Sequence, residues 1–589
     1  MASTSHTSPK ETSRRPDSEV TSASLSRKVH RGALWSIGSA IQLRTASIIT
    51  TAIVAHILDP RDFGIFAVAM TAYTIIFGLG EFGIGACLVR ADLDIEALAP
   101  TLNTLAVTTS ILQAAAMIEF AGPIARALGS PAAARPIRAM ALVVVIIGLS
   151  TIPTARIFRD FRQNRVFLAE ATSVVISTAT LLLLAKSGSG AMAFAWSRVI
   201  GQFISGCVVF ASAAKNYRFG FTAGALSVLF RIGIPLGFSG FVGYLLLNVD
   251  YALIGHTLGP SALGIYVIAF NVAMWPASLL GFMISNVAMP AFSRVKGDQA
   301  RVAGAVTDAL RAVSLVVMPI SGLTMVLAHP LVTVLYGQKW GTSARVLSIL
   351  VFYGAISLVC QLFSSLLAGL GQTKMLVAVQ TLWLAVLIPG MLIGISTDGI
   401  FGAAYAHVVV IGVIVLPCYF LTLRKAVRVR VSSVGRALSG ALIASIMAAL
   451  AAHSASDRFG SPLAQLVVGL AAGGVVYGLA MAPRFLQLLN SVQHSRTYGT
   501  HILRLYSNAA QVLRMPGASS PRHAAGRVTQ SAAGGPDRVR VVASFASPSA
   551  ASQLAALDLL VSLATPVSPV YMTRFREKPV HSMVDGRAG

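Results

Sequence analysis

One arginine lies near the middle of a long apolar segment, where a charge has few uses other than binding. Arg44 belongs to residues 32–57, and Ser47 and Thr51 follow three and seven positions later. On a helix these three side chains share a face and form a polar stripe. A guanidinium presents a planar fork of N–H donors that fits phosphate oxygens. The stripe is predicted to bind an anionic ligand, and a structural ion pair between Arg44 and Glu81 is the alternative.

Two later apolar segments, residues 228–255 and 263–288, place aromatic and amide side chains at helical spacing. Aromatic rings stack on sugar rings and amides hydrogen-bond sugar hydroxyls, so these side chains suit a glycan. Polar contacts between helices are the other interpretation. The residues concerned are Gly237, Gly240, Tyr244, Asn248 and Tyr251 in the first segment, and Asn271, Trp275 and Ser278 in the second. Of these, Tyr244, Asn248, Asn271 and Trp275 are predicted to contact the substrate.

Two carboxylates within apolar segments are candidates for binding a coupling ion. Asp250 lies about one and a half turns from the end of segment 228–255, and Glu81 lies toward the end of segment 64–88. An ionisable residue inside a membrane segment is by default a functional candidate. Access of either carboxylate to interfacial water is the structural alternative.

Neither catalysis nor a cofactor is expected. The sequence offers no set of nucleophile, base and orienting group, and no Walker motif for ATP. Its four cysteines occur singly in or beside apolar segments, without the paired spacing of metal sites or disulfides. They are Cys87, Cys207, Cys360 and Cys418. We therefore predict no catalytic residue, no metal site and no cofactor.

The composition is that of a membrane protein. The chain has 589 residues, of which 55% are hydrophobic and only 11% are charged, and its mean hydropathy is +0.73. So much apolar surface cannot be buried in soluble cores, and it falls into blocks of about 20 residues, the length that crosses a bilayer. The blocks lie near residues 32–57, 64–88, 101–121, 138–154, 166–185, 191–213, 228–255, 263–288, 312–335, 343–368, 375–395, 400–422, 435–453 and 463–481.

The charges predict orientation and partners. Lys and Arg concentrate in the loops on the same side as the N-terminus, such as the loop with Arg156, Arg159, Arg162 and Arg165. We therefore expect a multi-pass membrane protein with both termini in the cytoplasm. On a soluble protein a net charge of +25 would suggest nucleic acid, but here anionic membrane lipids are the expected partner.

Two stretches of the chain repeat each other. His56–Ala69, "HILDPRDFGIFAVA", and His256–Ala269, "HTLGPSALGIYVIA", share His, Leu, Pro, Gly, Ile and Ala at a constant offset of 200. Further on, "AGPIARALG" from Ala121 is echoed by "AHPLVTVLYG" from Ala328. A repeat unit of six helices places both copies in the same orientation, about an axis along the membrane normal. Transporters built in this way move their halves around a midplane site.

These patterns predict an all-α polytopic membrane protein. It should have about 14 transmembrane helices, in two pseudo-symmetric six-helix bundles plus two accessory helices. The expected parts are a disordered cytoplasmic N-terminal tail (1–30), an N-terminal six-helix bundle (31–215), a C-terminal six-helix bundle (216–423), two accessory transmembrane helices (424–482) and a mostly disordered, basic cytoplasmic tail (483–589).

Six stretches resemble one known family when taken in order. They are "RGALWSIGSAIQL", "ILDPRDFGIFAVA", "GLGEFGIGACLVR", "RDFRQNRVFLAEATSVV", "LLAGLGQTKMLVAVQ" and "GIFGAAYAHVVV", spread over about residues 25–425. Over this range the chain resembles the oligosaccharide flippases, the polysaccharide-exporter branch of the multidrug/oligosaccharidyl-lipid/polysaccharide (MOP) exporter superfamily.

The resemblance implies a function. Members turn undecaprenyl-diphosphate-linked oligosaccharide across the bacterial inner membrane by alternating access, through a vestibule lined mainly by helices 1, 2, 7 and 8. The cargo then serves surface polysaccharides such as lipopolysaccharide or exopolysaccharide. A polysaccharide polymerase and a chain-length regulator are possible partners. Arg44 fits the diphosphate of such a cargo.

Two relatives within the superfamily are the alternatives. A cation-coupled multidrug exporter would favour an acidic vestibule, whereas Arg44 favours an anion. A peptidoglycan-precursor lipid flippase also has fourteen helices and a cationic cavity, but the quoted stretches are less like that branch. The coupling ion or other energy source, and the glycan, stay open.

Overall fold

The structure is a computed structural model of the chain, and it describes residues 42–80 without 44, 95–213 without 161, 218–222, 226, 229, 234–281 without 279, 299–427 and 431–483. Within these ranges eleven helices are long and apolar enough to cross a membrane, and Thr45–Ile57 is a shorter apolar helix. The prediction of an all-helical polytopic membrane protein is confirmed.

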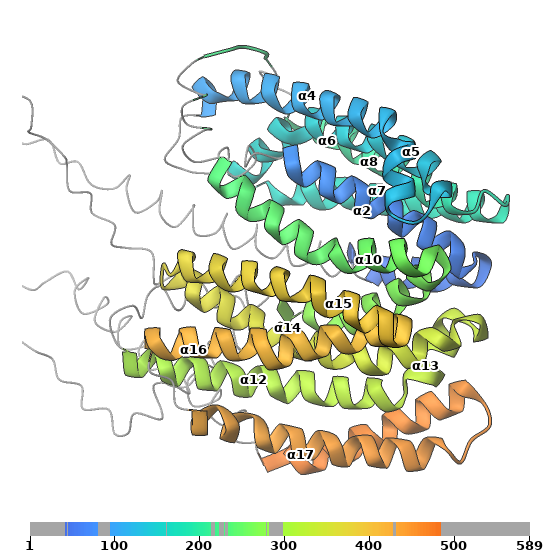
Figure 1. The fold of residues 1–589 in the computed structure, drawn as a ribbon, viewed down its shortest axis with the longest axis vertical. Helices are drawn as coiled ribbons and strands as arrows, with labels where there is room; N and C mark the ends of the chain where they lie inside the picture. Colours follow the sequence, from blue (N-terminus) through green and yellow to red (C-terminus); the bar gives the residue numbers. More distant parts are fainter. Residues whose placement is uncertain are drawn as a thin grey trace, which may run out of the picture.

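The first group of helices lies together at the top of Figure 1. Its core is built from apolar side chains of α2, α6 and α8, and α8 packs against α6 at Gly206 and against α7 at Gly201. Predicted segment 191–213 has the bounds of the observed helix. The group comprises α2 (Pro60–Gly80), α4 (Ile95–Glu119), α5 (Ala121–Ala127), α6 (Ala134–Arg159), α7 (Gln163–Lys186) and α8 (Ala191–Ala213).

The second group occupies the lower half of the same view. Its core surrounds α14, and α17 covers α12 at its edge. The group comprises α12 (Gln299–Val326), α13 (Ala328–Tyr336), α14 (Gly341–Gly369), α15 (Thr373–Val409), a π-helical turn (Val410–Val415), α16 (Leu416–Val427), α17 (Val431–Ser456) and the final span Pro462–Pro483.

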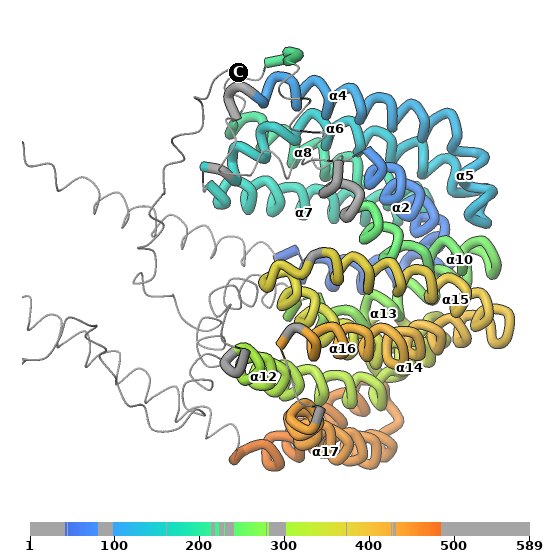
Figure 2. Tube along the Cα trace, turned by 60° about the vertical axis from the view of Figure 1, so that its left-hand side comes forward, coloured from blue at the N-terminus to red at the C-terminus, as the bar shows by residue number. Residues whose placement is uncertain are grey.

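α10 (Ile234–Ala273) lies between the two groups, packed against α2 on one side and α14 and α15 on the other (Figures 1 and 2). It consists of two helices joined at Gly259, whose φ of 80° and ψ of 178° interrupt the helix before Pro260. A positive φ of this size favours glycine because it has no Cβ. The predicted break between segments 228–255 and 263–288 is thus present, although helical hydrogen bonding is almost continuous across it.

The other segment boundaries differ from the predictions in two ways. α15 covers predicted segment 375–395 and the start of segment 400–422, with a break between them at Asp398 and Gly399, and the π-helical turn and α16 continue the second segment. Predicted segment 312–335 is wrong as one helix, because α12 ends at Val326 and α13 starts at Ala328. The echoed motifs at Ala121 and Ala328 form α5 and α13, each a short helix after a long one. The count of fourteen transmembrane helices stays a prediction.

The two copies of the repeat touch each other. A Cβ on Gly64 would overlap the carbonyl of Pro260, and a Cβ on Gly264 would overlap the carbonyl of Pro60. Reciprocal contact of this kind is what a two-fold axis between equivalent elements produces. It supports the interpretation of residues 56–69 and 256–269 as repeated units. We call residues 55–64, 255–264 and 337–340 the junction.

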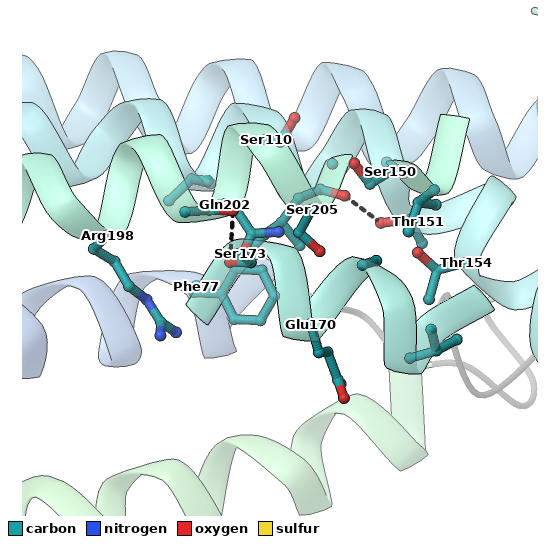
Figure 3. Close-up of a pocket in the computed structure, with 18 of the residues that line it drawn as sticks. Phe77, Ser110, Ser150, Thr151, Thr154, Glu170, Ser173, Arg198, Gln202 and Ser205 are labelled. Atoms are coloured by element: carbon teal, nitrogen blue, oxygen red, sulfur yellow. Dashed lines mark hydrogen bonds between the residues drawn. The ribbon is translucent and has the colours of Figure 1, made fainter. Parts of the chain in front are cut away.

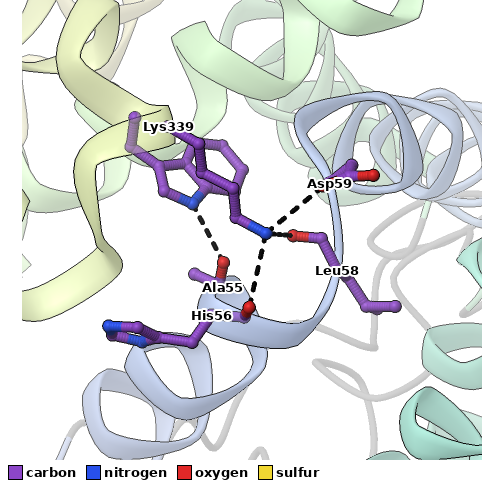
Figure 4. Close-up of polar contacts among 6 residues, drawn as sticks. Ala55, His56, Leu58, Asp59 and Lys339 are labelled. Carbon is purple, nitrogen blue, oxygen red and sulfur yellow. Dashed lines mark hydrogen bonds and ion pairs between the residues drawn. The ribbon is translucent and has the colours of Figure 1, made fainter.

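Side chains of the second group also cap the helix Thr45–Ile57 at the junction (Figure 4). Lys339 Nζ donates to the carbonyl of Leu58 at 2.7 Å and to that of His56 at 3.4 Å, and lies 3.3 Å from the carboxylate of Asp59. The buried Trp340 donates its indole N–H to the Ala55 carbonyl at 3.0 Å. These donors satisfy carbonyls that a helix end leaves free, so they join the two halves of the molecule.

Candidate functional site

A cavity of about 660 Å³, with polar and apolar side chains in its wall, lies within the first group of helices (Figure 3). Its walls come from α4, α6, α7 and α8, with Phe77 and Gly80 from α2 and Leu43 from the preceding helix. Small-molecule sites commonly occupy about 300–1,000 Å³. A cavity of this size with hydroxyl, amide and charged groups in its wall is a candidate ligand site.

Most hydroxyl groups around the cavity are satisfied by backbone carbonyls. Ser150 and Thr151 donate to carbonyls four residues earlier on α6, at 2.7 and 2.9 Å. Ser173 donates to the carbonyl of Gly201 at 2.7 Å and so joins α7 to α8. A side chain on Gly201 would approach Ser177 Cβ at 2.8 Å, so glycine permits the two helices to pack this closely. These residues keep the cavity wall in place.

Four polar side chains lining the cavity make no hydrogen bond or ion pair within the part of the chain that the structure describes: Thr154, Arg198, Gln202 and Ser205. Arg198 lies in α8, and its side chain extends in Figure 3 toward the same side as that of Glu170 from α7. An arginine at membrane depth costs about 2.5–3.5 kcal/mol when it faces lipid. The exposed side chain of Arg198 lines the cavity instead of facing lipid.

A second polar cluster lies inside the other half of the molecule. Asp250 on α10 is only 1% exposed, and its Oδ2 accepts a hydrogen bond from the Tyr266 hydroxyl at 3.3 Å. His407 on α15 is also 1% exposed, with Nε2 3.5 Å from the same oxygen. The other Asp250 oxygen and both His407 ring nitrogens have no hydrogen-bond partner among the described residues. This acid–base pair is therefore buried and under-satisfied.

Aromatic rings enclose the pair. The Tyr353 ring lies 4.7 Å from the His407 ring and the Phe270 ring lies 5.9 Å from it. Tyr266 stacks on Phe270, with 5.8 Å between the centroids. The π-helical turn Val410–Val415 begins three residues after His407, and such turns are frequent at functional sites. A buried charge in such surroundings is costly unless it is paired or hydrogen-bonded.

The predicted residues for the diphosphate and the coupling ion differ in where the structure places them. Arg44 and Glu81 lie outside the described residues. Ser47 is exposed and Thr51 half-buried on the helix Thr45–Ile57, which leaves both accessible to a ligand. Predicted ion ligand Asp250 is in the buried pair described above.

The predicted sugar-binding residues of α10, and Trp275 just beyond its end, are largely engaged within the protein. The Asn248 amide donates to the Tyr244 carbonyl at 2.8 Å, and the exposed Asn271 donates its amide to the Val267 carbonyl at 2.9 Å. The Tyr244 ring packs where a side chain on Gly78 would stand, and the half-buried Trp275 packs against the core. α2 and α10 therefore contact each other along this face.

Sequence inspection missed Arg198 and His407. Each is an ionisable residue inside a predicted apolar segment, 191–213 and 400–422 respectively. That placement is itself a signal of function. Neither lies in the helices on which the vestibule prediction concentrated, which is why neither was selected.

The sequence of this chain is similar to known polysaccharide proteins. Residues 53–345 match a family model described as "Polysaccharide biosynthesis protein". The chain is 25% identical over 463 residues to the succinoglycan biosynthesis transport protein ExoT of Rhizobium meliloti, covering 77% of this chain and 92% of that protein. It is 23% identical over 403 residues to the lipopolysaccharide biosynthesis protein WzxC of Escherichia coli, covering 68% of this chain and 82% of that protein.

The fold is similar to a solved structure of the lipid II flippase MurJ in an inward closed conformation. The TM-score is 0.65 at 15% sequence identity, and the match covers 78% of this chain and all of that one. At this identity the likeness concerns the fold alone.

Proposed function

We propose that this chain, a membrane transport protein of polysaccharide biosynthesis in the MOP exporter superfamily, moves lipid-linked oligosaccharide across the membrane by alternating access. The lipid is undecaprenyl diphosphate, and the membrane is the bacterial inner membrane with both termini of the chain in the cytoplasm. The exported units serve a surface polysaccharide. A polymerase and a chain-length regulator are its expected partners.

The observation that carries this proposal is the cavity among the spanning helices, whose wall carries several hydroxyl and amide groups. Groups such as Ser205 and Gln202 suit the hydroxyls of a glycan. The contacts at the junction add a place where the two halves can separate and rejoin. Lys339 and Trp340 link the second half to the first there.

Binding of the diphosphate is assigned to Arg44, with Ser47 and Thr51 on the same helical face. Tyr244, Asn248, Asn271 and Trp275 stay proposed contacts of the cargo, although both amides are hydrogen-bonded to their own helix. A rearrangement of α10 against α2 would have to free them.

Ion coupling is assigned to Asp250, with Glu81 as a second carboxylate. Asp250 has one oxygen without a partner in the described part of the chain, and it lies beside His407. A carboxylate beside a histidine and a phenol offers an oxygen ligand to a coupling cation. This pair therefore supports transport that is driven by an ion gradient.

The experiment is transport by the purified protein in liposomes. Undecaprenyl-diphosphate oligosaccharide with a fluorescent sugar is placed in both leaflets, and a membrane-impermeant glycosidase reports the accessible fraction. We expect complete digestion with the protein and half digestion without it. Half digestion in both would refute the proposal, and movement of cationic drugs instead would support the multidrug-exporter alternative.

The peptidoglycan-precursor flippase alternative is tested in the same liposomes. A lipid-linked peptidoglycan precursor should move at least tenfold more slowly than a lipid-linked oligosaccharide without a peptide. The opposite preference would favour that alternative.

A further inference from the structure

We propose that the cavity of α4, α6, α7 and α8 is a saccharide site in which Arg198 binds the carboxylate of an acidic sugar. The inference rests on the proposed function and names the class of glycan: a negatively charged one, bearing a uronic acid or an acidic acyl substituent. Arg198 was not among the predicted site residues.

The wall of the cavity suits a saccharide. Thr154, Gln202 and Ser205 come from two different helices and have no partner among the described residues, so their donors and acceptors are available to sugar hydroxyls. Phe77 contributes an aromatic ring to the same wall (Figure 3). Unpaired hydroxyl and amide groups would be costly to leave dry, so the cavity holds either water or a hydrated ligand.

Arg198 indicates that the ligand is anionic. Its guanidinium has five N–H donors and no acceptor, and no described residue satisfies any of them. A carboxylate would accept two parallel hydrogen bonds from it, the geometry in which arginine binds most selectively. In the partly enclosed cavity such a pair is stronger than at a protein surface.

The charge of the wall distinguishes a sugar carboxylate from the diphosphate of the lipid. Arg198 and Glu170 are the two charged residues among the described residues that line the cavity. One guanidinium matches the single charge of a sugar carboxylate in a bidentate pair, whereas a diphosphate carries more than one negative charge. Binding of the lipid diphosphate stays assigned to Arg44.

Two cargoes that share the lipid diphosphate test the assignment. One contains a glucuronic acid residue and the other contains glucose at the same position. Transport of each is measured in liposomes with wild-type protein, Arg198→Gln and Arg198→Lys. Arg138→Gln is the matched control, because Arg138 is an exposed arginine of the same bundle outside the cavity.

We expect Arg198→Gln to slow the acidic cargo by about 10- to 100-fold, since a hydrogen-bonded charge pair of this kind contributes about 1.5–3 kcal/mol. The neutral cargo should slow less than threefold, and Arg198→Lys should keep part of the acidic transport. Equal loss for both cargoes would assign Arg198 to the diphosphate and overturn the inference. Unchanged transport of both would overturn it too.

A binding measurement separates this inference from the proposed function. The free acidic oligosaccharide, without lipid, should raise the Tm of detergent-solubilised wild-type protein but not that of Arg198→Gln. The neutral oligosaccharide should give a smaller difference in Tm between the two proteins. This result supports the saccharide site even when neither lipid-linked cargo moves. Absence of a shift in wild-type protein overturns the site while leaving lipid-linked transport intact.

Discussion

Replacing Lys339 by alanine should weaken the junction and shift the protein toward a state in which the two halves separate there. Lys339 Nζ donates to the carbonyls of Leu58 and His56 and lies near the carboxylate of Asp59. The side chain of Lys339 is 33% exposed and that of Asp59 is 76% exposed, so water screens the ion pair and it contributes little. The hydrogen bond to Leu58 is short, and it should dominate.

The expected size follows from these contacts. A charge-assisted hydrogen bond to a carbonyl contributes about 1.5–3 kcal/mol when buried, and partial exposure reduces the total here to about 1–2 kcal/mol. Since about 1.4 kcal/mol corresponds to a tenfold change in an equilibrium constant, the separated state should become about 5- to 30-fold more populated. Trp340→Phe removes a buried hydrogen bond to Ala55 and should act in the same direction.

The assay is a distance distribution between two spin labels, one in each half. Ser187 and Ser396 suit the labels because both are exposed and their hydroxyls bond only nearby carbonyls or a neighbouring serine. Lys339→Ala should add or enlarge a longer-distance population. Lys186→Ala is the control, an exposed lysine with no partner among the described residues. Identical distributions in wild-type and Lys339→Ala protein would refute the role of this contact.

Three other expectations concern charge and topology. Arg44→Gln should lose most transport of lipid-linked oligosaccharide at normal abundance while Arg44→Lys keeps part of it; full activity of Arg44→Gln would refute binding of the diphosphate there. Asp250→Asn should abolish ion-driven transport at normal protein abundance, and adding His407→Gln should not restore transport. If the pair were purely structural, each single variant would lower protein abundance and the double variant would recover it. A cysteine at Ser261 should react with an impermeant reagent from outside the cell and one at Gln372 should not; the reverse labelling would overturn the predicted orientation.

The membrane helices could be predicted because hydropathy acts locally. Segment 191–213 coincides with α8, and segment 343–368 differs from α14 by a few residues. The breaks between helices were harder to predict. Gly259 alone turns the chain without a polar loop, and only Leu327 separates α12 from α13 inside an apolar stretch. Hydropathy averages over such positions, so it cannot detect them.

The repeat showed which elements would correspond, but not where side chains would meet. The motif at Gly64 and Gly264 predicted related units, and the reciprocal approach to Pro260 and Pro60 adds the reason for glycine. Arg198 and its neighbours depend on the relative rotation of four helices. Pairs such as Asp250 and His407 are 157 positions apart, and only packing of α10 against α15 brings them together.

The two polar sites lie in different halves of the molecule and have opposite chemistry. Arg198 in the first half suits an anion, and Asp250 in the second suits a cation or a proton. α2 and α10 form the contact between the halves, and Asp250 itself belongs to α10. A change of charge at Asp250 that moves α10 would therefore also move α2, whose Phe77 lines the cavity. Coupling through such a contact is reciprocal, so an acidic saccharide at Arg198 should alter ion binding at Asp250 by the same factor by which the ion alters saccharide binding. Titration of one ligand at fixed concentrations of the other measures this factor, and a factor of one would show that the two sites are not coupled.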